Sequence, residues 1–315
     1  QLWEASWAGA MKVPFFAAAN GSWIRATPAA DEEHLYVAGI RDVLVCLKQA
    51  TGEIVWKADF VEKLGSELPS FGFASSPLIA GDAIYVQAGG GFLKVDKASG
   101  EVLWRKLDDG GGMGGSAFSS PVMQKINGKN QLLVQTRTKL AGVAPSDGKV
   151  LWSEPIEAFR GMNILTPVLY KNNIFTSSYG GGTFLISASG EGDQWSAEQL
   201  WRNKLQGYMS SPILIGENIY MHQRNQRFAS INLETGKENW ITKPFGKYWS
   251  MVSNGKKILS LDSDGELILI EASPQEFKLL DRKKVSDSST WAHLVVVGDE
   301  VYVRALDNLT AYQWK

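Results

Sequence analysis

The chain has 315 residues, of which 44% are apolar and 21% are charged, and its formal net charge is −1. This length suits two average domains or one large all-β domain, and the apolar content is enough for a packed core. The near-balance of charge argues against nucleic acid as a partner. No apolar run approaches the roughly 18–20 residues of a membrane helix, so no membrane span is predicted. The single cysteine, Cys46, excludes an internal disulfide framework.

A short phrase with a glycine-containing turn and a tryptophan returns along the chain. It begins as ATGEIVW at 50–56 and recurs as ASGEVLW, SDGKVLW and ETGKENW. The tryptophans at this position, or standing for it, are Trp56, Trp104, Trp152, Trp201 and Trp240. A Ser-Pro or Thr-Pro pair also recurs, at Thr27-Pro28, Ser76-Pro77, Ser120-Pro121, Thr166-Pro167 and Ser211-Pro212. Both marks recur about every 40–50 residues, and this shared period indicates internal repeats.

Each repeat contains four short runs of alternating apolar and polar residues. In the second repeat these runs are SSPLIA, AIYVQA, GFLKVD and EVLWRKL, separated by turns rich in Gly and Asp. Four strands in each unit of about 40–50 residues is the pattern of a β-propeller. We therefore predict an all-β fold, with the whole chain as one β-propeller domain.

The repeats number seven. The predicted blades are approximately 22–60, 73–107, 118–156, 163–205, 209–244, 249–286, and 291–315 together with 1–7. The last repeat has only three strands, so we expect the N-terminal strand to complete it, with Trp3 at the repeat position. This arrangement closes the propeller without a free edge; eight blades are the alternative.

These phrases resemble the repeats of the pyrroloquinoline quinone (PQQ)-like propeller family over essentially the whole chain. The family includes quinoprotein dehydrogenases and the propeller lipoprotein of the outer-membrane barrel assembly machinery. The likeness is greatest to uncharacterised secreted PQQ-like repeat proteins of bacteria, and such relatives usually have eight blades. The resemblance implies a periplasmic or secreted protein, and we expect a processed start because the given chain opens without a signal peptide.

Quinone chemistry is not expected from this resemblance. Quinoprotein dehydrogenases place two adjacent cysteines against PQQ and hold calcium with acidic and amide side chains. The chain has one cysteine and no recognisable acid and amide cluster. We therefore predict no cofactor and no metal, since a fold does not carry its relatives' function with it.

The residues that precede each inner strand are bulky or carry amides, and arginines follow the second strands. In a propeller these loops converge at one mouth of the central channel, which could bind a sugar, a carboxylated small ligand or a peptide. The alternative is that the aromatic side chains fill the channel and the arginines pair with acids. The candidate ligand-binding residues are Trp23, Arg25, Phe73, Arg137, Arg160, Asn163, Met209, Arg224, Trp249, Trp291, His293 and Arg304.

Two classes of function remain open. The first is a non-catalytic binding or scaffold propeller, a monomer that presents the channel mouth to a small molecule, glycan or protein. The second is an enzyme acting on a carbohydrate-like substrate, with His293, Tyr208 and Tyr248 as weak candidates for proton transfer. A quinone-dependent oxidoreductase is the distant third. The glycine-rich YGGGTF (179–184) lacks the context of a phosphate-binding loop and is interpreted as a turn.

Overall fold

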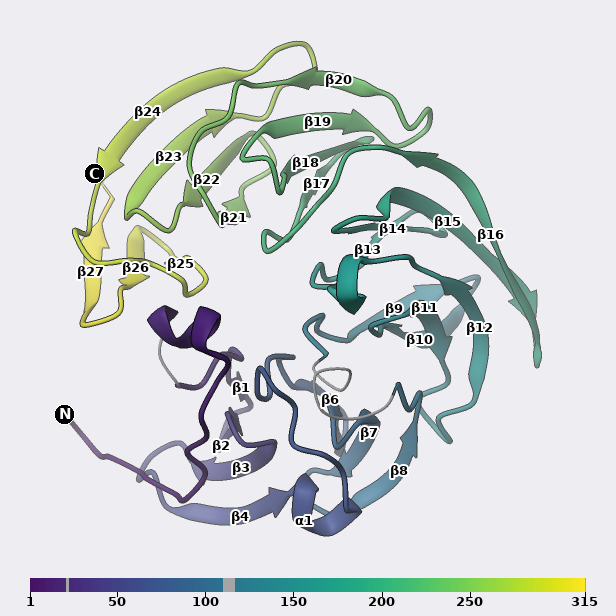
Figure 1. Cartoon of the computed structure of the whole chain (residues 1–315), viewed down its shortest axis with the longest axis vertical. Helices are drawn as coiled ribbons and strands as arrows, with labels where there is room; N and C mark the ends of the chain where they lie inside the picture. The colour runs from purple at the N-terminus through teal and green to yellow at the C-terminus, as the bar shows by residue number, and fades with distance from the viewer. Residues whose placement is uncertain (21–22, 110–116, 315) are drawn as a thin grey trace. The chain divides into compact units, whose positions relative to one another are not determined.

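The computed structural model describes residues 1–20, 23–109 and 117–314. These residues form seven antiparallel sheets, and the strands of each sheet follow one another in chain order (Figure 1). Six sheets have four strands and the last has three. The fold is a seven-bladed β-propeller, as the repeats predict. The chain divides into two compact units, residues 1–167 with 188–198 and residues 168–187 with 199–315; that they form one domain stays a prediction.

The first unit contains three complete sheets. Their strands are β1 (Ala29–Ala30), β2 (His34–Gly39), β3 (Val43–Lys48) and β4 (Ile54–Asp59); β5 (Leu78–Ala80), β6 (Ala83–Ala88), β7 (Gly91–Asp96) and β8 (Val102–Lys106); and β9 (Val122–Ile126), β10 (Lys129–Gln135), β11 (Lys139–Val143) and β12 (Val150–Pro155). Helix η1 (Phe15–Asn20) precedes the first sheet, α1 (Phe60–Leu64) lies between the first and second, and η2 (Phe159–Gly161) follows the third.

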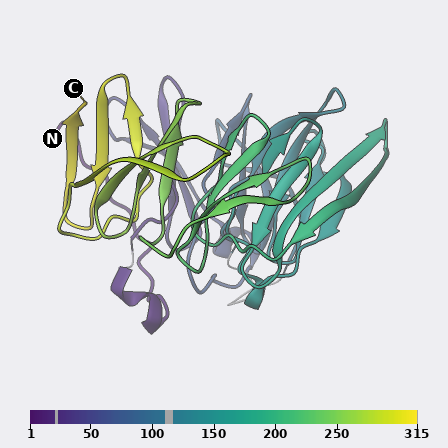
Figure 2. The ribbon, with the colours of Figure 1, turned by 90° about the horizontal axis from the view of Figure 1, so that it is seen from above.

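The second unit contains the remaining sheets. Their strands are β13 (Val168–Tyr170), β14 (Asn173–Ser178), β15 (Gly182–Glu191) and β16 (Gln194–Asn203); β17 (Ile213–Ile215), β18 (Asn218–His222), β19 (Phe228–Asn232) and β20 (Glu238–Ile241); β21 (Ser250–Ser253), β22 (Lys257–Leu261), β23 (Glu266–Glu271) and β24 (Lys278–Lys284); and β25 (Val295–Val297), β26 (Glu300–Arg304) and β27 (Leu309–Gln313). The hairpin tip of β15 and β16 belongs to the first unit. Figure 2 shows this long hairpin in teal.

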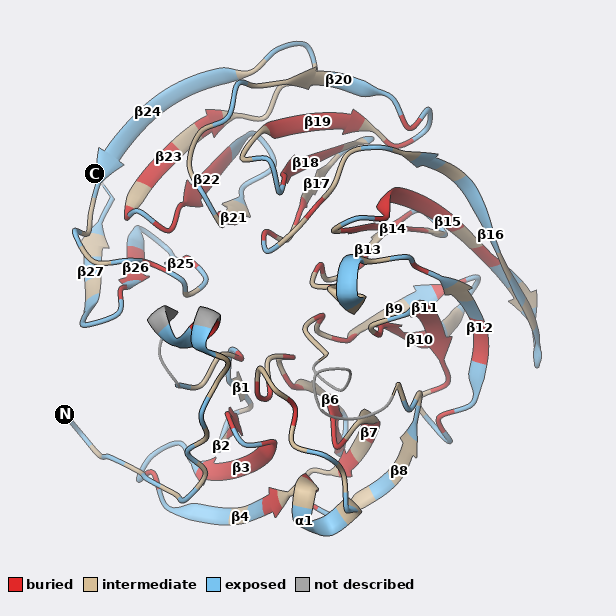
Figure 3. Cartoon of the chain, in the orientation of Figure 1, coloured by how far each residue is buried: buried red, intermediate tan, exposed pale blue. Residues whose placement is uncertain are grey.

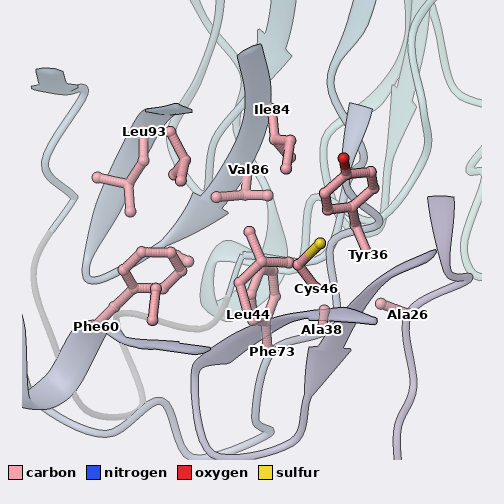
Figure 4. Packing of buried hydrophobic residues seen from close by; sticks show 13 residues of the cluster. Ala26, Tyr36, Ala38, Leu44, Cys46, Phe60, Phe73, Ile84, Val86 and Leu93 are labelled. Carbon is pink, nitrogen blue, oxygen red and sulfur yellow. The ribbon is translucent and has the colours of Figure 1, made fainter. Parts of the chain in front are cut away.

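Burial follows the position of a strand within its sheet. The middle strands β3, β10 and β19 are almost entirely buried, whereas every residue of the outer strand β24 is exposed (Figure 3). Between the first two sheets, Tyr36 and Cys46 of one sheet pack with Ile84 and Val86 of the next, and Phe60 joins the same cluster (Figure 4). Cys46 is thus a core thiol, as expected of an apolar strand residue.

The repeated tryptophans join consecutive sheets. The indole N–H of Trp56 donates to Lys97 O at 3.0 Å, in the turn before the outer strand of the next sheet. Trp201 and Trp240 make the same bond, to Leu233 O at 2.8 Å and Ser273 O at 2.9 Å. The ring lies so close to the turn that a Cβ on Gly100 would be 2.6 Å from Trp56. The phrase therefore recurs because its tryptophan packs against the turn of the next blade.

Trp152 departs from this pattern. Its indole donates to Gln131 Oε1 at 2.8 Å, within its own sheet, and it is buried. The side of this sheet is covered instead by the tip of the β15–β16 hairpin, where Lys149 pairs with Asp193 at 2.9 Å and Lys129 donates to Gly192 O at 2.7 Å. The periodicity of the sequence does not distinguish a tryptophan that bonds to the next sheet from one that bonds within its own sheet.

The N-terminal segment corrects one part of the fold prediction. Residues 1–14 form no strand, so the fourth strand expected from residues 1–7 is not formed beside β27. The segment is held through its side chains instead: Ala5 and Trp7 pack on Val37 and Val45. Trp3 donates to Gln49 O at 2.9 Å, so it occupies the repeat position as predicted.

Candidate functional site

Four aromatic side chains of the second unit form a continuous row of ring contacts. They come from the β14–β15 turn and from the loops before β17, β21 and β25. The ring centroids of Tyr179 and Tyr208 lie 5.4 Å apart, those of Tyr208 and Tyr248 6.1 Å, and those of Tyr248 and Trp291 4.6 Å. Trp291 is 38% exposed and the three tyrosines are half-buried. We call Tyr179, Tyr208, Tyr248 and Trp291 the aromatic row.

Backbone bonds between loops fix the first half of the row. Gln206 lies just before Tyr208, and its side chain accepts from Gly180 N–H at 3.1 Å while its carbonyl accepts from Arg224 N–H at 3.0 Å. The three loops that carry Tyr179, Tyr208 and Arg224 are therefore tied together. The row is a preformed feature of the unit, and ordering it costs little when a ligand binds.

Tyr248 holds the second half of the row in a strained conformation. Its φ is +51°, in the left-handed region that L residues other than Gly, Asn and Asp rarely adopt. The preceding residue is fixed by a bond from Ser263 N–H to Lys247 O at 2.9 Å, and the following residue, Trp249, is buried. Because backbone strain of this kind is concentrated at functional sites, the conformation of Tyr248 supports a functional role for the row.

Arg224 and Met209 extend the row. The Arg224 guanidinium lies over the Tyr179 ring at 4.1 Å from its centroid, and the side chain is exposed. Met209, next to Tyr208, is 41% exposed. Burial, and secondarily the neighbouring Tyr248 and Tyr179, raise the pKa of Tyr208, while Arg224 opposes the rise. The raised pKa keeps the Tyr208 phenol neutral, and Arg224 adds one cation beside it.

In the first unit the predicted residues have other environments. Phe73 is 1% exposed, and Asn163 is also buried, with its amide donating to Thr136 O, Arg137 O and Ile156 O. Arg137 donates to Arg160 O at 2.5 Å, so this cation binds the backbone of its own unit. Phe73 and Asn163 are corrections: both are covered by the chain, because one fills the core and the other satisfies three carbonyls.

Trp23, Arg25 and Arg160 remain accessible in the first unit. Trp23 is 47% exposed, Arg160 is exposed, and Arg25 is half-buried with a pKa lowered by that burial. The structure does not bring them into a continuous row like that of the second unit. Their role as ligand-binding residues stays a prediction.

Trp249 is a further correction. It is 1% exposed and its ring stacks on His222 at a centroid distance of 4.4 Å, with Phe228 and Phe245 around it. It fills the core of the second unit and cannot contact a ligand here. Its neighbour Tyr248 is the accessible aromatic residue, and the backbone at +51° turns the two rings to different environments.

The candidate proton-transfer groups form no catalytic pair. His293 and Arg304 are exposed, and His293 makes no hydrogen bond with Tyr208 or Tyr248 in the described part of the chain. Burial of its ring nevertheless lowers the pKa of His293. Tyr208 with its raised pKa is a poorer proton donor than a free tyrosine. These observations do not support the enzyme alternative.

Sequence reasoning missed Tyr179, which was interpreted only as part of the YGGGTF turn. The residue lies in the β14–β15 turn, where its ring contacts Tyr208 and supports Arg224. The sequence does hold one indication of this role. Tyr179 directly precedes a glycine-rich turn, and it lies between the second and third strands of its blade, as Arg224 does in the next blade. The contact itself depends on loops more than 25 residues apart.

The residues present do not fit a quinone cofactor with calcium. The single cysteine is 1% exposed and lies in the core beside Tyr36, so it cannot flank a bound ring. Within residues 1–20, 23–109 and 117–314, no group of three or more His, Cys, Asp or Glu side chains could hold a metal ion. A search of the same residues finds no helix of the length and apolarity needed to cross a membrane.

Two hollows lie away from the aromatic row. One, of about 10 Å³, is lined by Gln87, Asp109, Arg137 and neighbours, and suits a single water molecule. The other is an open depression of about 400 Å³ beside Lys284–Ser288 and Asp307–Thr310. No residue of the row lines either hollow.

The comparisons with known protein families, sequences and structures all find similarity to proteins of one description. A family model described as outer membrane protein assembly factor BamB matches residues 1–242. Two curated proteins of that name are similar: one from Shewanella oneidensis, 22% identical over 91% of this chain and 75% of its own, and one from Yersinia pestis, 19% identical over 97% and 75%. The crystal structure of BamB from Moraxella catarrhalis superposes with a TM-score of 0.67 at 16% identity, covering 93% of this chain and 83% of that one.

Proposed function

The chain belongs to the family described as outer membrane protein assembly factor BamB, and from that membership we propose that it is a non-catalytic scaffold serving outer membrane protein assembly in a bacterium. It would act in the periplasm, beside the membrane that the family name specifies. The proposal includes a protein partner, bound at the aromatic row, in preference to a glycan or small molecule.

The single observation that carries this proposal is the exposed row of Tyr179, Tyr208, Tyr248 and Trp291. Aromatic residues, Met and Arg are the residue types enriched where proteins bind one another, and tyrosine and tryptophan dominate the energetically important positions. Consecutive ring contacts join one turn and three loops of the second unit along the row. A protein segment is the ligand that such a preformed aromatic surface accommodates best.

The role in outer membrane protein assembly can be tested by deleting the gene that encodes this chain from its bacterium. We expect folded β-barrel proteins in the outer membrane to decrease, as measured by heat-modifiable mobility on gels. Wild-type protein should restore them, whereas the double variant Tyr208→Ala/Trp291→Ala should not, at equal protein level. Leu279→Ala is the matched control, because Leu279 is 43% exposed on the outer strand β24.

Three outcomes contradict the proposal. Unchanged outer membrane proteins after deletion would remove the role in assembly. Full restoration by the double variant would show that the row is not the binding surface. A glycan that binds the purified protein and is lost in the same variant would assign the row to a carbohydrate instead.

A further inference from the structure

Arg224 differs from Arg137 and Arg282 in the contacts that its guanidinium makes. Its guanidinium stacks on Tyr179, yet within the described residues it makes no hydrogen bond or ion pair. Arg137 donates to a backbone carbonyl of its own unit, and Arg282 pairs with Glu266. Arg224 is therefore oriented by the ring beneath it while its N–H donors face solvent.

An arginine that is stacked on a ring and has no acceptor for its N–H groups is well oriented to bind a planar anion. The guanidinium fork matches a carboxylate, with two parallel N–H···O bonds, and stacking on an aromatic ring restricts the side chain before binding. The side-chain entropy that normally opposes an exposed ion pair is thus partly lost already. The geometry at Arg224 points to a carboxylate as one part of the ligand.

The rest of the ligand must cover the row that begins beneath Arg224. Consecutive ring contacts between 4.6 and 6.1 Å lead from Tyr179 to Trp291. An extended polypeptide rises about 3.3 Å per residue, so the row spans at most roughly five residues of such a segment. Exposed Met209 beside the row adds an adaptable apolar contact that suits varied side chains.

The orientation of the rings favours a peptide over a sugar. Tyr179 and Tyr208 meet edge to face, at an interplanar angle of 73°, and Tyr208 and Tyr248 are tilted by 48°. A carbohydrate needs flat ring faces and several polar side chains for its hydroxyls, whereas tilted rings with a Met and one Arg provide apolar notches and one ionic contact.

Building on the scaffold function above, we propose that the aromatic row and Arg224 together bind an extended acidic and aromatic segment of a partner polypeptide. A Glu or Asp side chain of that segment pairs with Arg224, and the aromatic side chains that follow it pack on Tyr208, Tyr248 and Trp291. Arg224 sets the register and the rings supply the apolar contact area.

Fluorescence anisotropy with a synthetic peptide tests this inference. The probe is a ten-residue peptide of alternating Phe and Ser with one internal Glu, labelled at its N-terminus and amidated at its C-terminus. A second peptide carries Gln in place of Glu. We expect the Glu peptide to bind about tenfold tighter, the range of a charge-assisted pair on a surface, and the difference to shrink at high salt.

Variants show which residues bind the carboxylate of the peptide and which bind its apolar side chains. Arg224→Gln should remove the difference between the two peptides, and Arg224→Lys should restore only part of it, because an ammonium lacks the planar fork. Tyr248→Gly should weaken both peptides alike. Arg282→Gln, an exposed arginine on the outer strand β24, is the matched control and should change nothing.

Three results would overturn the inference. They are equal binding of the Glu and Gln peptides, no binding of either peptide, and tighter binding of a Gln peptide whose only carboxylate is a free C-terminus. If Tyr248→Gly weakens both peptides while Arg224→Gln has no effect, the carboxylate is excluded and the scaffold function stands. The scaffold function itself fails only in the deletion experiment.

Discussion

The residues before the inner strands contact one another differently in the two units. In the first unit Phe73 at this position is buried while Trp23 is exposed, and Arg137 nearby binds a carbonyl of its own unit. In the second unit Trp249 is buried, whereas Tyr208 and Trp291 are accessible and touch Tyr248 between them, and the Arg224 guanidinium makes no hydrogen bond within the described residues. A repeat position is therefore not a functional position; what matters is whether the loop turns its ring into the core or out of it.

The loop backbone decides between these outcomes. Gly72 has φ +75° and lies against Ile40, where a Cβ would be 2.5 Å from Ile40 O. This tight turn lets Phe73 N–H donate to Ile40 O at 3.2 Å and directs the ring inward. In the second unit the strained residue is Tyr248 itself, so its ring stays out and Trp249 fills the core.

The sharpest test compares two tryptophans of the second unit. Trp249→Ala should lower the free energy of unfolding by about 3–5 kcal/mol, because it leaves a large cavity among His222, Phe228 and Phe245. Trp291→Ala should cost less than about 1 kcal/mol, since the ring is 38% exposed. Denaturant unfolding measures both; equal losses would show that the row is part of the core.

Buried titratable groups should give the two units opposite responses to pH. In the first unit, burial raises the pKa of Asp42 to about 6, although its carboxylate accepts from Gly89 N–H at 2.6 Å. In the second unit, burial lowers the pKa of His222 to about 4, and its ring bonds Phe245 O. Burial therefore favours the neutral form of each group in the folded protein.

The sign of each effect follows from linkage. The Asp42 contribution is fully present below about pH 4 and is lost as pH rises through 6, whereas that of His222 is present above about pH 6.5 and is lost as pH falls toward 4. Each is worth about 2–3 kcal/mol. Unfolding of Asp42→Asn and His222→Phe across this range should give difference curves of opposite slope; parallel curves would contradict it.

A smaller effect is expected from the buried amide of the first unit. Asn163→Ala leaves the carbonyls of Thr136, Arg137 and Ile156 without their donor and should cost about 2 kcal/mol. Met209→Ala is the comparison in the second unit and should change stability by less than about 0.5 kcal/mol, because Met209 is exposed. Chemical denaturation checks both, and a costly Met209→Ala would place that side chain in the core.

The difference between these regions also marks the limit of what the sequence predicts. Seven blades followed from two recurring marks, because strand alternation and turn glycines are local properties. The repeat position of Trp3 followed too, but its segment is held by side chains without strand pairing. The exposure of Tyr248 and the burial of Trp249 depend on one φ angle and on contacts with β18 and β19 far along the chain. Such non-local contacts leave no periodic mark.

The smallest effect distinguishes backbone strain from side-chain contact, because each unit has a non-glycine residue with a positive φ in a loop before an inner strand. Arg160 has φ +53° and Tyr248 has φ +51°. Glycine adopts this conformation without steric cost, so Arg160→Gly should raise stability by up to about 1 kcal/mol. Tyr248→Gly gains the same relief but loses ring contacts worth about 0.5–1 kcal/mol, so its unfolding midpoint should stay nearly unchanged while binding at the row falls. A clear loss of stability in Tyr248→Gly, measured beside Arg160→Gly, would mean that the ring supports the fold and that the strain is not kept for binding.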